Sequence, residues 1–275
     1  MKKETKDDYY YSVCKVVLYI EENYSSNLTL EKLSKIASFS KYHFHRIFKS
    51  IVGENLKDYI IRVRLQSTTL KFKTNQKITQ IAMGSGYETS ASFTRAFKKH
   101  FNMTPREFTK YSKVKKGTNN LSPKFIYSDE EKVFYVRKIG EYSKSCREAW
   151  QVLLDFISTN NIEKEKVIKI GIVHDDPYVT PVSELRCDAC AILNNQEIEP
   201  FGEVLTKSIS SGNHAVFLHI GPYEEIHGVY DSIGDWIVEN KIELRDSPMF
   251  VKYLDVDPKK VKCEDKKTEI YVPLV

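Results

Sequence analysis

The sequence lacks any long apolar run, since no stretch approaches the roughly 18 residues that a membrane-spanning helix needs. Its first residues, MKKETKDDYYYS, contain no apolar segment of the kind that a secretory signal carries. Cysteine is scarce: five residues, an odd number without regular spacing, do not indicate a disulfide framework. These absences favour a cytoplasmic protein that has no membrane partner.

Common catalytic and cofactor motifs are also missing. The seven histidines show no His-Glu-x-x-His spacing, and there is neither a glycine-rich phosphate loop nor a nucleophile elbow. Cys187 and Cys190 are three residues apart, and strand residues at that spacing point to opposite faces, so this pair does not predict a zinc or redox site. We therefore expect no metal, no cofactor and no enzymatic activity.

Charge is unevenly distributed along the 275 residues, a length that predicts two domains. The first 113 residues hold 21 Lys and Arg against 10 Asp and Glu, a net charge of +11. The remaining residues hold 21 against 27, a net charge of −6. A basic half joined to an acidic half indicates a polyanion-binding module attached to a second module, although chance asymmetry is the plainer alternative.

Residues 11–111 show helical periodicity, with apolar side chains recurring at spacings of three and four and few prolines. Ser40 and Thr89, 49 residues apart, stand where helix N-caps are expected. Thr104-Pro105-Arg106-Glu107 is a capping box with proline at the first helical position. The predicted helices span residues 30–37, 40–51, 56–72, 78–83 and 89–100.

The segment Phe-x-Arg-x-Phe-Lys occurs twice, at residues 44–49 and 93–98. Each copy follows a short helix and a turn, which is helix-turn-helix order, and the second helix of such a unit enters the major groove. The phenylalanines would anchor the helix to its own core, while Arg and Lys would face DNA bases and phosphates. The helix over 56–72, about 25 Å long, would hold the two units near one DNA turn apart. The alternative is a pair of ordinary solvated amphipathic helices, but two matching copies favour DNA.

Residues 27–108 closely resemble the DNA-binding domain of AraC/XylS-type transcription regulators. The matching segments are LTLEKLSKIASFSKYHFHRIFKSIVGENLKDYIIRVRL and ITQIAMGSGYETSASFTRAFKKHFNMTPREF. The resemblance implies double-stranded DNA as a partner, contact with RNA polymerase, and a role as activator. Ala91 is poor at hydrogen bonding to bases, so the first recognition helix is expected to read more sequence than the second. With Lys49 from the doubled segment, the expected DNA-binding residues are Lys41, Tyr42, His45, Arg46, Lys49, Ser90, Ala91, Ser92 and Arg95.

Residues 112–124 are polar and predict a linker between a domain at 1–111 and a domain at 125–275. In the second domain KVFYVRKIG and HAVFLHIG begin two copies of a pattern, and one offset of 81 relates Tyr142 to Tyr223 and Asp188 to Glu269. Each copy predicts strand, helix, strand, strand. The fold class is thus multidomain, with an all-α double helix-turn-helix domain followed by an α+β domain of two such repeats. The ranges are helices at 145–157 and 224–239, and later strands at 167–173, 186–193, 250–254 and 269–273.

Glu269 lies among strand residues in TEIYVPL, and alternation puts Glu269 and Tyr271 on the same face. A carboxylate among aromatic rings suits a hydrophobic cation. The alternative is a solvated Glu269 beside aromatic residues that only form the core.

Residues 134–274 resemble the GyrI-like small-molecule-binding domain of Rob-type and multidrug-binding regulators. The segments that carry the likeness are GPYEEIHGVYDSIGDWIVENKIELRDSPMFVKYLDVDP, TEIYVPL and DDPYVTPVSELRCDA. The resemblance implies a cleft for a lipophilic, often cationic effector, with Glu269 as its central carboxylate. Two alternatives stay open: a hydrolase of small electrophiles with Glu269 as general base, and a domain that only contacts partner proteins. The expected ligand-binding residues are Glu269, Tyr142, Trp150, Tyr178, Tyr223, Trp236, Phe250 and Tyr271.

Overall fold

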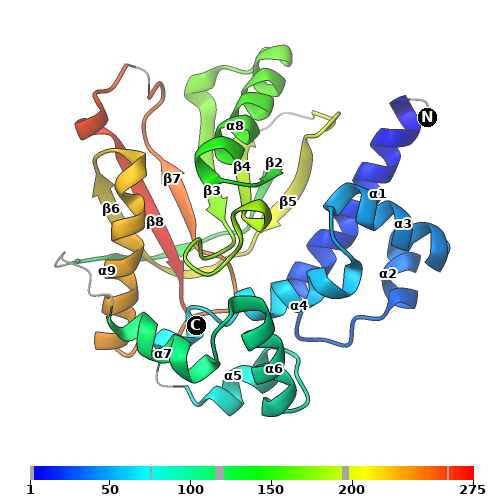
Figure 1. The fold of residues 1–275 in the computed structure, drawn as a ribbon. Coiled ribbons are helices and arrows are strands. Elements are labelled where there is room, and N and C mark those ends of the chain that lie inside the picture. Colours follow the sequence, from blue (N-terminus) through cyan, green and yellow to red (C-terminus); the bar gives the residue numbers. More distant parts are fainter. Residues whose placement is uncertain (1–2, 75, 115–120, 194–197, 259) are drawn as a thin grey trace. The chain divides into compact units, whose positions relative to one another are not determined.

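The computed structural model describes residues 3–74, 76–114, 121–193, 198–258 and 260–275. The chain divides into two compact units, residues 1–114 and 115–275, which are the blue-to-teal and green-to-red parts of Figure 1. The last helix of the first unit extends three residues past the expected boundary, to Val114. Residues 115–120 of the expected linker lie outside the described residues.

The first unit is helical throughout its described secondary structure, as its sequence periodicity predicts. Helices α2 and α3 form one helix-turn-helix pair, and α5 and α6 form the other. Helix α4 and the 3₁₀ turn η1 lie between the two pairs in the chain. The elements are α1 (Lys3–Glu22), α2 (Leu30–Ile36), α3 (Lys41–Val52), α4 (Leu56–Gln66), η1 (Lys71–Lys73), α5 (Ile78–Gly84), α6 (Ser90–Phe101) and α7 (Pro105–Val114).

The predicted N-caps are confirmed. The Ser40 hydroxyl accepts a hydrogen bond from the His43 backbone N–H at the start of α3, and the Thr89 hydroxyl does the same for Ser92 at the start of α6. The capping box before α7 is also present: Thr104 N–H donates to the Glu107 carboxylate at 2.6 Å, and Glu107 N–H donates to the Thr104 hydroxyl at 3.2 Å. Local side-chain chemistry therefore fixes where three of these helices begin.

The predicted linking helix over residues 56–72 is wrong in length, because α4 ends at Gln66. The hydroxyls of Ser67, Thr68 and Thr69 each donate to the carbonyl three residues back, at 2.6–2.9 Å. Such local bonds offer the backbone an alternative to regular helix. The eleven residues of α4 span about 16 Å, and the chain reaches the second pair through a turn and η1.

Each helix-turn-helix pair has its own aromatic core. Phe44 and Phe48 of α3 are fully buried, and Phe48 packs edge-on against Tyr59 of α4. Phe93 and Phe97 of α6 are equally buried. The doubled segment thus turns its phenylalanines inward in both copies, as expected.

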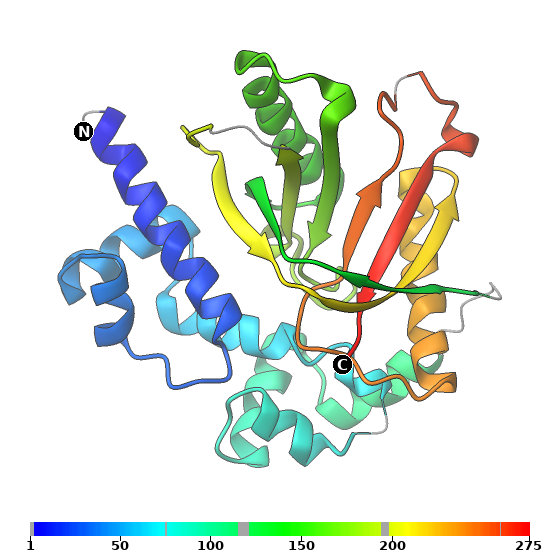
Figure 2. The same ribbon diagram turned by 180° about the vertical axis from the view of Figure 1, so that it is seen from behind.

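The second unit contains one eight-stranded antiparallel sheet, ordered β1-β6-β8-β7-β3-β4-β2-β5. The two predicted repeats are β2-α8-β3-β4 and β6-α9-β7-β8, and they meet where β3 pairs with β7 (Figures 1 and 2). The predicted α+β class is confirmed. The elements are β1 (Lys124–Ser128), β2 (Glu131–Ile139), α8 (Tyr142–Thr159), η2 (Lys164–Lys166), β3 (Val167–Val173), η3 (Val182–Glu184), β4 (Arg186–Leu193), β5 (Leu205–Ile209), β6 (Gly212–Ile220), η4 (Tyr223–Glu225), α9 (Ile226–Glu239), β7 (Phe250–Tyr253), η5 (Cys263–Asp265) and β8 (Lys267–Pro273).

Two strands, β1 and β5, were not expected from the sequence. Each precedes one repeat in the chain but pairs with the other: β1 pairs with β6, and β5 pairs with β2. The two halves therefore exchange their leading strands, which form the two edges of the sheet.

Both long helices cover the same face of the sheet. Side chains of α8 pack on Ala189 and Ala191 of β4, and those of α9 pack on Ile270 and Val272 of β8. We call this the helix face. Because strand side chains alternate, the neighbouring residues of β4 and β8 point the other way. This opposite face carries Asp188, Cys190, Glu269 and Tyr271.

One disulfide joins Cys146, in the first half of α8, to Cys187 of β4. The cysteine spacing gave no reason to expect this bond, because the two residues are 41 positions apart and meet only when α8 packs on the sheet. Their Cα atoms are 5.6 Å apart, within the usual range for a disulfide.

Candidate DNA interface and effector site

The outer side of α3 carries all the DNA-contact residues expected on it. With Phe44 and Phe48 turned inward, His45 and Arg46 between them are exposed, and Tyr42 is 76% exposed. The Arg46 guanidinium lies over the Tyr42 ring, 5.9 Å from its centroid. This contact restrains both side chains, and it leaves the Arg46 guanidinium on the surface. Exposed on this helix are Lys41, Tyr42, His45, Arg46 and Lys49.

The outer side of α6 has smaller side chains. Ala91, Ser92 and Arg95 are exposed, and Ser90 is half-buried. The Ser92 hydroxyl donates to the Thr89 carbonyl at 2.8 Å, so it serves the helix cap. Arg95 is therefore the residue of this expected set with the longest reach and a fixed charge.

A glycine shapes the turn before α6. Gly86 has φ +81°, in the left-handed region that favours glycine, and a Cβ there would lie 2.8 Å from the Ser25 carbonyl oxygen. The next residue, Tyr87, packs edge-on against Phe93. Burial raises the pKa of Tyr87 to about 12, partly offset by the nearby Arg64 charge. The Gly-aromatic turn thus anchors the second recognition helix.

An acidic residue that the sequence analysis did not single out lies beside Lys41, at the start of α3. Glu31 of α2 pairs with Lys41 at 3.2 Å and with Lys35 at 3.4 Å. The hydrogen bond and charge of Lys41, followed by those of Lys35, lower the pKa of the Glu31 carboxyl. Lys41 is therefore already engaged when DNA is absent.

In the second unit, Glu269 is half-buried on the opposite face of the sheet. The Tyr271 hydroxyl donates to a Glu269 carboxylate oxygen at 3.0 Å. Burial, together with the hydrogen bond and charge of Glu269, raises the pKa of Tyr271. Phe250 stacks on Tyr271 at 4.5 Å, and His214 lies edge-on to both rings. Three of the expected ligand-binding residues, Glu269, Tyr271 and Phe250, are therefore brought together.

The other expected aromatic residues lie elsewhere. Trp150 and Tyr223 both pack edge-on against Tyr253, at 5.5 and 5.1 Å, on the helix face. The Tyr142 hydroxyl donates to the Asp175 carbonyl at 2.7 Å. Burial, followed by the charge of Asp175, raises the pKa of Tyr142.

Two further residues of that set are Tyr178 and Trp236. Tyr178 lies between β3 and η3 and is 52% exposed. Trp236 of α9 packs against Phe217 at 5.1 Å, toward the β1 edge of the helix face. The sheet thus separates Trp150, Tyr223 and Trp236 from Glu269. Alternation along one strand does not predict this for side chains on helices and in loops.

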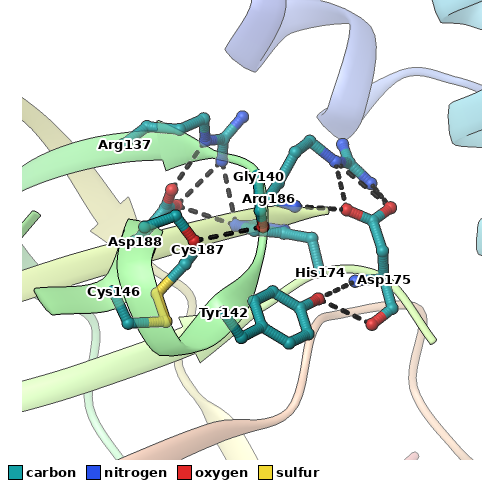
Figure 3. The surroundings of a disulfide bond; sticks show 10 residues. Arg137, Gly140, Tyr142, Cys146, His174, Asp175, Arg186, Cys187 and Asp188 are labelled. Carbon is teal, nitrogen blue, oxygen red and sulfur yellow. Dashed lines mark hydrogen bonds and ion pairs between the residues drawn. A yellow bond between two sulfur atoms is a disulfide. The ribbon is translucent and has the colours of Figure 1, made fainter. Parts of the chain in front are cut away.

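A buried charge cluster in the first repeat was also missed. Arg137 of β2 binds the Asp188 carboxylate through two nitrogens, at 2.6 and 2.8 Å (Figure 3). His174 Nε2 and Lys207 Nζ lie 2.8 and 2.5 Å from the same carboxylate. Burial alone would raise the pKa of Asp188, but the charges of Arg137, Lys207 and His174 hold it well below its ordinary value. The 81-residue offset to Glu269 was the one signal that pointed to Asp188.

Figure 3 shows that the disulfide lies beside this cluster, since Cys187 is adjacent to Asp188 in β4. The residue before Cys187 in the same strand, Arg186, pairs with Asp175 through its guanidinium at 2.7 Å. The first repeat therefore buries two acids, Asp175 and Asp188, and each of them is paired with an arginine.

In the described part of the chain, the His, Cys, Asp and Glu side chains form no group of three or more suited to hold a metal ion. None of the helices in that part is both long enough and apolar enough to span a bilayer.

Two helix-turn-helix units followed by a pair of strand-helix-strand-strand repeats define a DNA-binding module joined to a separate α+β module. The chain belongs to the GyrI-like small molecule binding domain family, which matches residues 121–275, and a helix-turn-helix domain family matches residues 33–111. The chain is an AraC-family DNA-binding transcription regulator with a GyrI-like domain.

Curated relatives match the chain over about a hundred residues. The bifunctional transcriptional activator/DNA repair enzyme AdaA of Bacillus subtilis (strain 168) is 38% identical over 102 residues, which is 37% of this chain and 48% of AdaA. The multiple antibiotic resistance protein MarA of Escherichia coli (strain K12) is 35% identical over 91 residues, which is 33% of this chain and 72% of MarA. The chain thus spans about half the length of AdaA.

A solved structure, the EcmrR C-terminal domain, is similar over 57% of this chain and 99% of its own length, at 18% identity and a TM-score of 0.49.

Proposed function

We propose that the chain is a transcription activator that binds promoter DNA through α3 and α6 and is controlled by a lipophilic cation held at Glu269. The observation that carries the DNA part is the doubled segment. In both copies the phenylalanines are sealed inside while Arg46 and Arg95 are exposed. A basic helix surface presented twice suits consecutive major grooves of one duplex.

The two recognition helices would contact the bases of their half-sites differently. On α3, Arg46 can fork onto guanine, while Tyr42 and His45 add stacking and hydrogen-bonding groups. On α6, Ala91 can contact a thymine methyl and Arg95 a guanine or a phosphate. The first half-site would therefore be read in more detail than the second. Contact with RNA polymerase rests on the family resemblance.

The DNA part is tested by selecting the preferred duplex from a random pool with the full-length chain. The affinities of Arg46→Ala and Lys110→Ala for that duplex are then compared at one salt concentration. Both variants lose one exposed positive charge, but only Arg46 is on a recognition helix. An equal loss of DNA affinity in both variants would show that Arg46 contributes only its charge and that it does not read the sequence.

The effector part rests on the surroundings of Glu269. Among the described residues it forms no ion pair within 4.0 Å, and its hydrogen bond comes from the neutral Tyr271 hydroxyl. A half-buried carboxylate favours an incoming cation, and the Tyr271 and Phe250 rings can stabilise that cation further. The ligand would shift the population of the DNA-competent state.

The test uses decyltrimethylammonium as a probe and decanoate as its matched anion. Titration of the full-length chain should show binding of the ammonium compound only, and Glu269→Gln should weaken it at least tenfold. A Glu269→Gln variant that binds the probe as tightly as the wild type would exclude Glu269 as the cation site.

One observation favours the hydrolase alternative: Tyr271 and Glu269 form a hydrogen-bonded acid and carboxylate pair. The raised pKa of Tyr271 makes it a poor proton donor, which argues against that role. A binding domain returns its ligand unchanged, so mass spectrometry of a recovered electrophilic ligand separates the two functions.

A further inference from the structure

The two repeats place an acid at equivalent positions but surround it differently. Asp188 of β4 and Glu269 of β8 both lie on the opposite face of the sheet. Directly across from Asp188 on the neighbouring strand is Arg137, and directly across from Glu269 is Leu218. Arg137 and Leu218 are related by the same offset of 81 residues as the two acids. The same position of the repeat thus holds a cation in one half and an alkyl group in the other.

In the first repeat, the Asp188 carboxylate is buried and surrounded by partners within the chain. Its side chain is 0% exposed, and it is contacted by Arg137 of β2, by Lys207 of β5 and by His174, which directly follows β3. Arg137, His174 and Lys207 are themselves about nine-tenths buried, with side-chain exposures of 10%, 10% and 9%. Asp188 therefore has no capacity left for a cation from solution, and a cation that approaches it meets like charges.

In the second repeat, the Glu269 carboxylate is accessible to solvent. Glu269 is half-buried, and Leu218 across from it is 54% exposed. On the other neighbouring strand Lys252 is directly across from Glu269, yet no ion pair within 4.0 Å joins the two described side chains. Tyr271 supplies the single hydrogen bond described for the carboxylate.

We infer that this face of the sheet takes an effector with one cationic centre, bound at Glu269, and rejects a second centre at Asp188. Arg137 contacts Asp188, whereas at the equivalent position Leu218 leaves Glu269 accessible, and Lys252 on the other side of Glu269 forms no ion pair with it. This inference rests on the proposed role of Glu269 as cation site. The two acids are three strands and two residues apart in the sheet, about 16 Å by regular strand spacing. The effector class is therefore a monocation whose apolar body lies against Leu218.

The first test compares two probes on the full-length chain by titration calorimetry. Decyltrimethylammonium carries one charge, and 1,10-bis(trimethylammonium)decane carries one at each end of the same chain. The monocation should bind at least tenfold more tightly. A bis-cation that binds as tightly as the monocation, or more tightly, would overturn the inference and leave the role of Glu269 intact. If neither probe binds, the cation site itself is wrong and the inference falls with it.

The second test transfers the arrangement of the first half to the second. Leu218→Arg puts a guanidinium across from Glu269, as Arg137 is across from Asp188, and an exposed position tolerates the change. The variant should lose at least tenfold in decyltrimethylammonium affinity, about 1.4 kcal/mol. The matched control Ile220→Arg adds the same charge at an equally exposed residue of β6, across from Lys267, and should keep the wild-type affinity within about twofold. Wild-type affinity in Leu218→Arg would show that the residue across from the acid does not control cation binding.

Discussion

Removing the charge of Asp188 should destabilise the second unit severely. Asp188→Asn keeps the shape of the side chain but leaves Arg137 and Lys207 buried without their carboxylate. Breaking a buried pair by removing one partner costs about 3–5 kcal/mol, because the remaining charge is uncompensated. With a urea dependence of roughly 2 kcal/mol per molar, the unfolding midpoint should fall by about 1.5–2.5 M.

The chain offers a matched control. Glu203 pairs with Lys138 at 2.6 Å, a distance like those around Asp188, but its side chain is 47% exposed. An exposed pair contributes about 0–1 kcal/mol because water screens it. Glu203→Gln should therefore shift the midpoint little. The two substitutions separate the effect of burial from the effect of distance.

Tryptophan fluorescence during urea unfolding suits this comparison. The two tryptophans of the sequence, Trp150 and Trp236, both lie in the second unit. Their emission reports the unfolding of that unit within the full-length chain. Equal midpoint shifts for Asp188→Asn and Glu203→Gln would refute the argument that burial makes the Asp188 cluster important.

The same cluster predicts a pH dependence. The pKa of Asp188 is lowered in the folded state relative to the unfolded value of about 3.9. The contribution of the Asp188 charge to the free energy of unfolding is therefore complete above the unfolded pKa, and it is lost as the pH falls through the folded pKa. The stability difference between wild type and Asp188→Asn should be constant near neutral pH and shrink below about pH 4. A difference that grows in acid would contradict the assigned charge state.

Three further predictions concern other parts of the chain. Arg46→Ala should lower affinity for the selected duplex by about 1–3 kcal/mol and relax preference at one base pair, as measured by fluorescence anisotropy at fixed salt; an unchanged preference excludes a base contact. Glu31→Gln should raise DNA affinity about two- to fivefold and steepen its salt dependence, because it frees Lys41 for phosphate; unchanged affinity would show that this pair does not compete with DNA. Cys146→Ser opens the 41-residue disulfide loop to Cys187 and should cost about 4 kcal/mol on the chain-entropy relation. Urea unfolding with and without reductant checks this last value, and a wild type insensitive to reductant would contradict it.

Features set by neighbouring residues were predictable from the sequence. Ser40 and Thr89 cap their helices because a hydroxyl three residues before a free N–H satisfies it locally. Alternation along one strand was enough to place Glu269 and Tyr271 together. The early end of α4 had a local cause too, in the hydroxyls after Gln66, but helical periodicity continued past them.

Features set by long-range pairing were not predictable in the same way. The strands β1 and β5 are short, and each pairs with the distant repeat, so no local pattern indicated them. The Asp188 cluster draws Arg137 from 51 positions away and Lys207 from 19. Its members meet only once β2, β4 and β5 are paired, which periodicity along one segment cannot reveal.

The most direct test of the central claim is a hydroxyl-radical footprint of the full-length chain on its selected duplex. The exposed faces of α3 and α6 predict two protected stretches about one helical turn apart, with Arg46→Ala weakening one stretch and Arg95→Ala the other. Protection that is unaffected by both substitutions, or confined to a single stretch, would contradict the claim that two recognition helices read neighbouring major grooves.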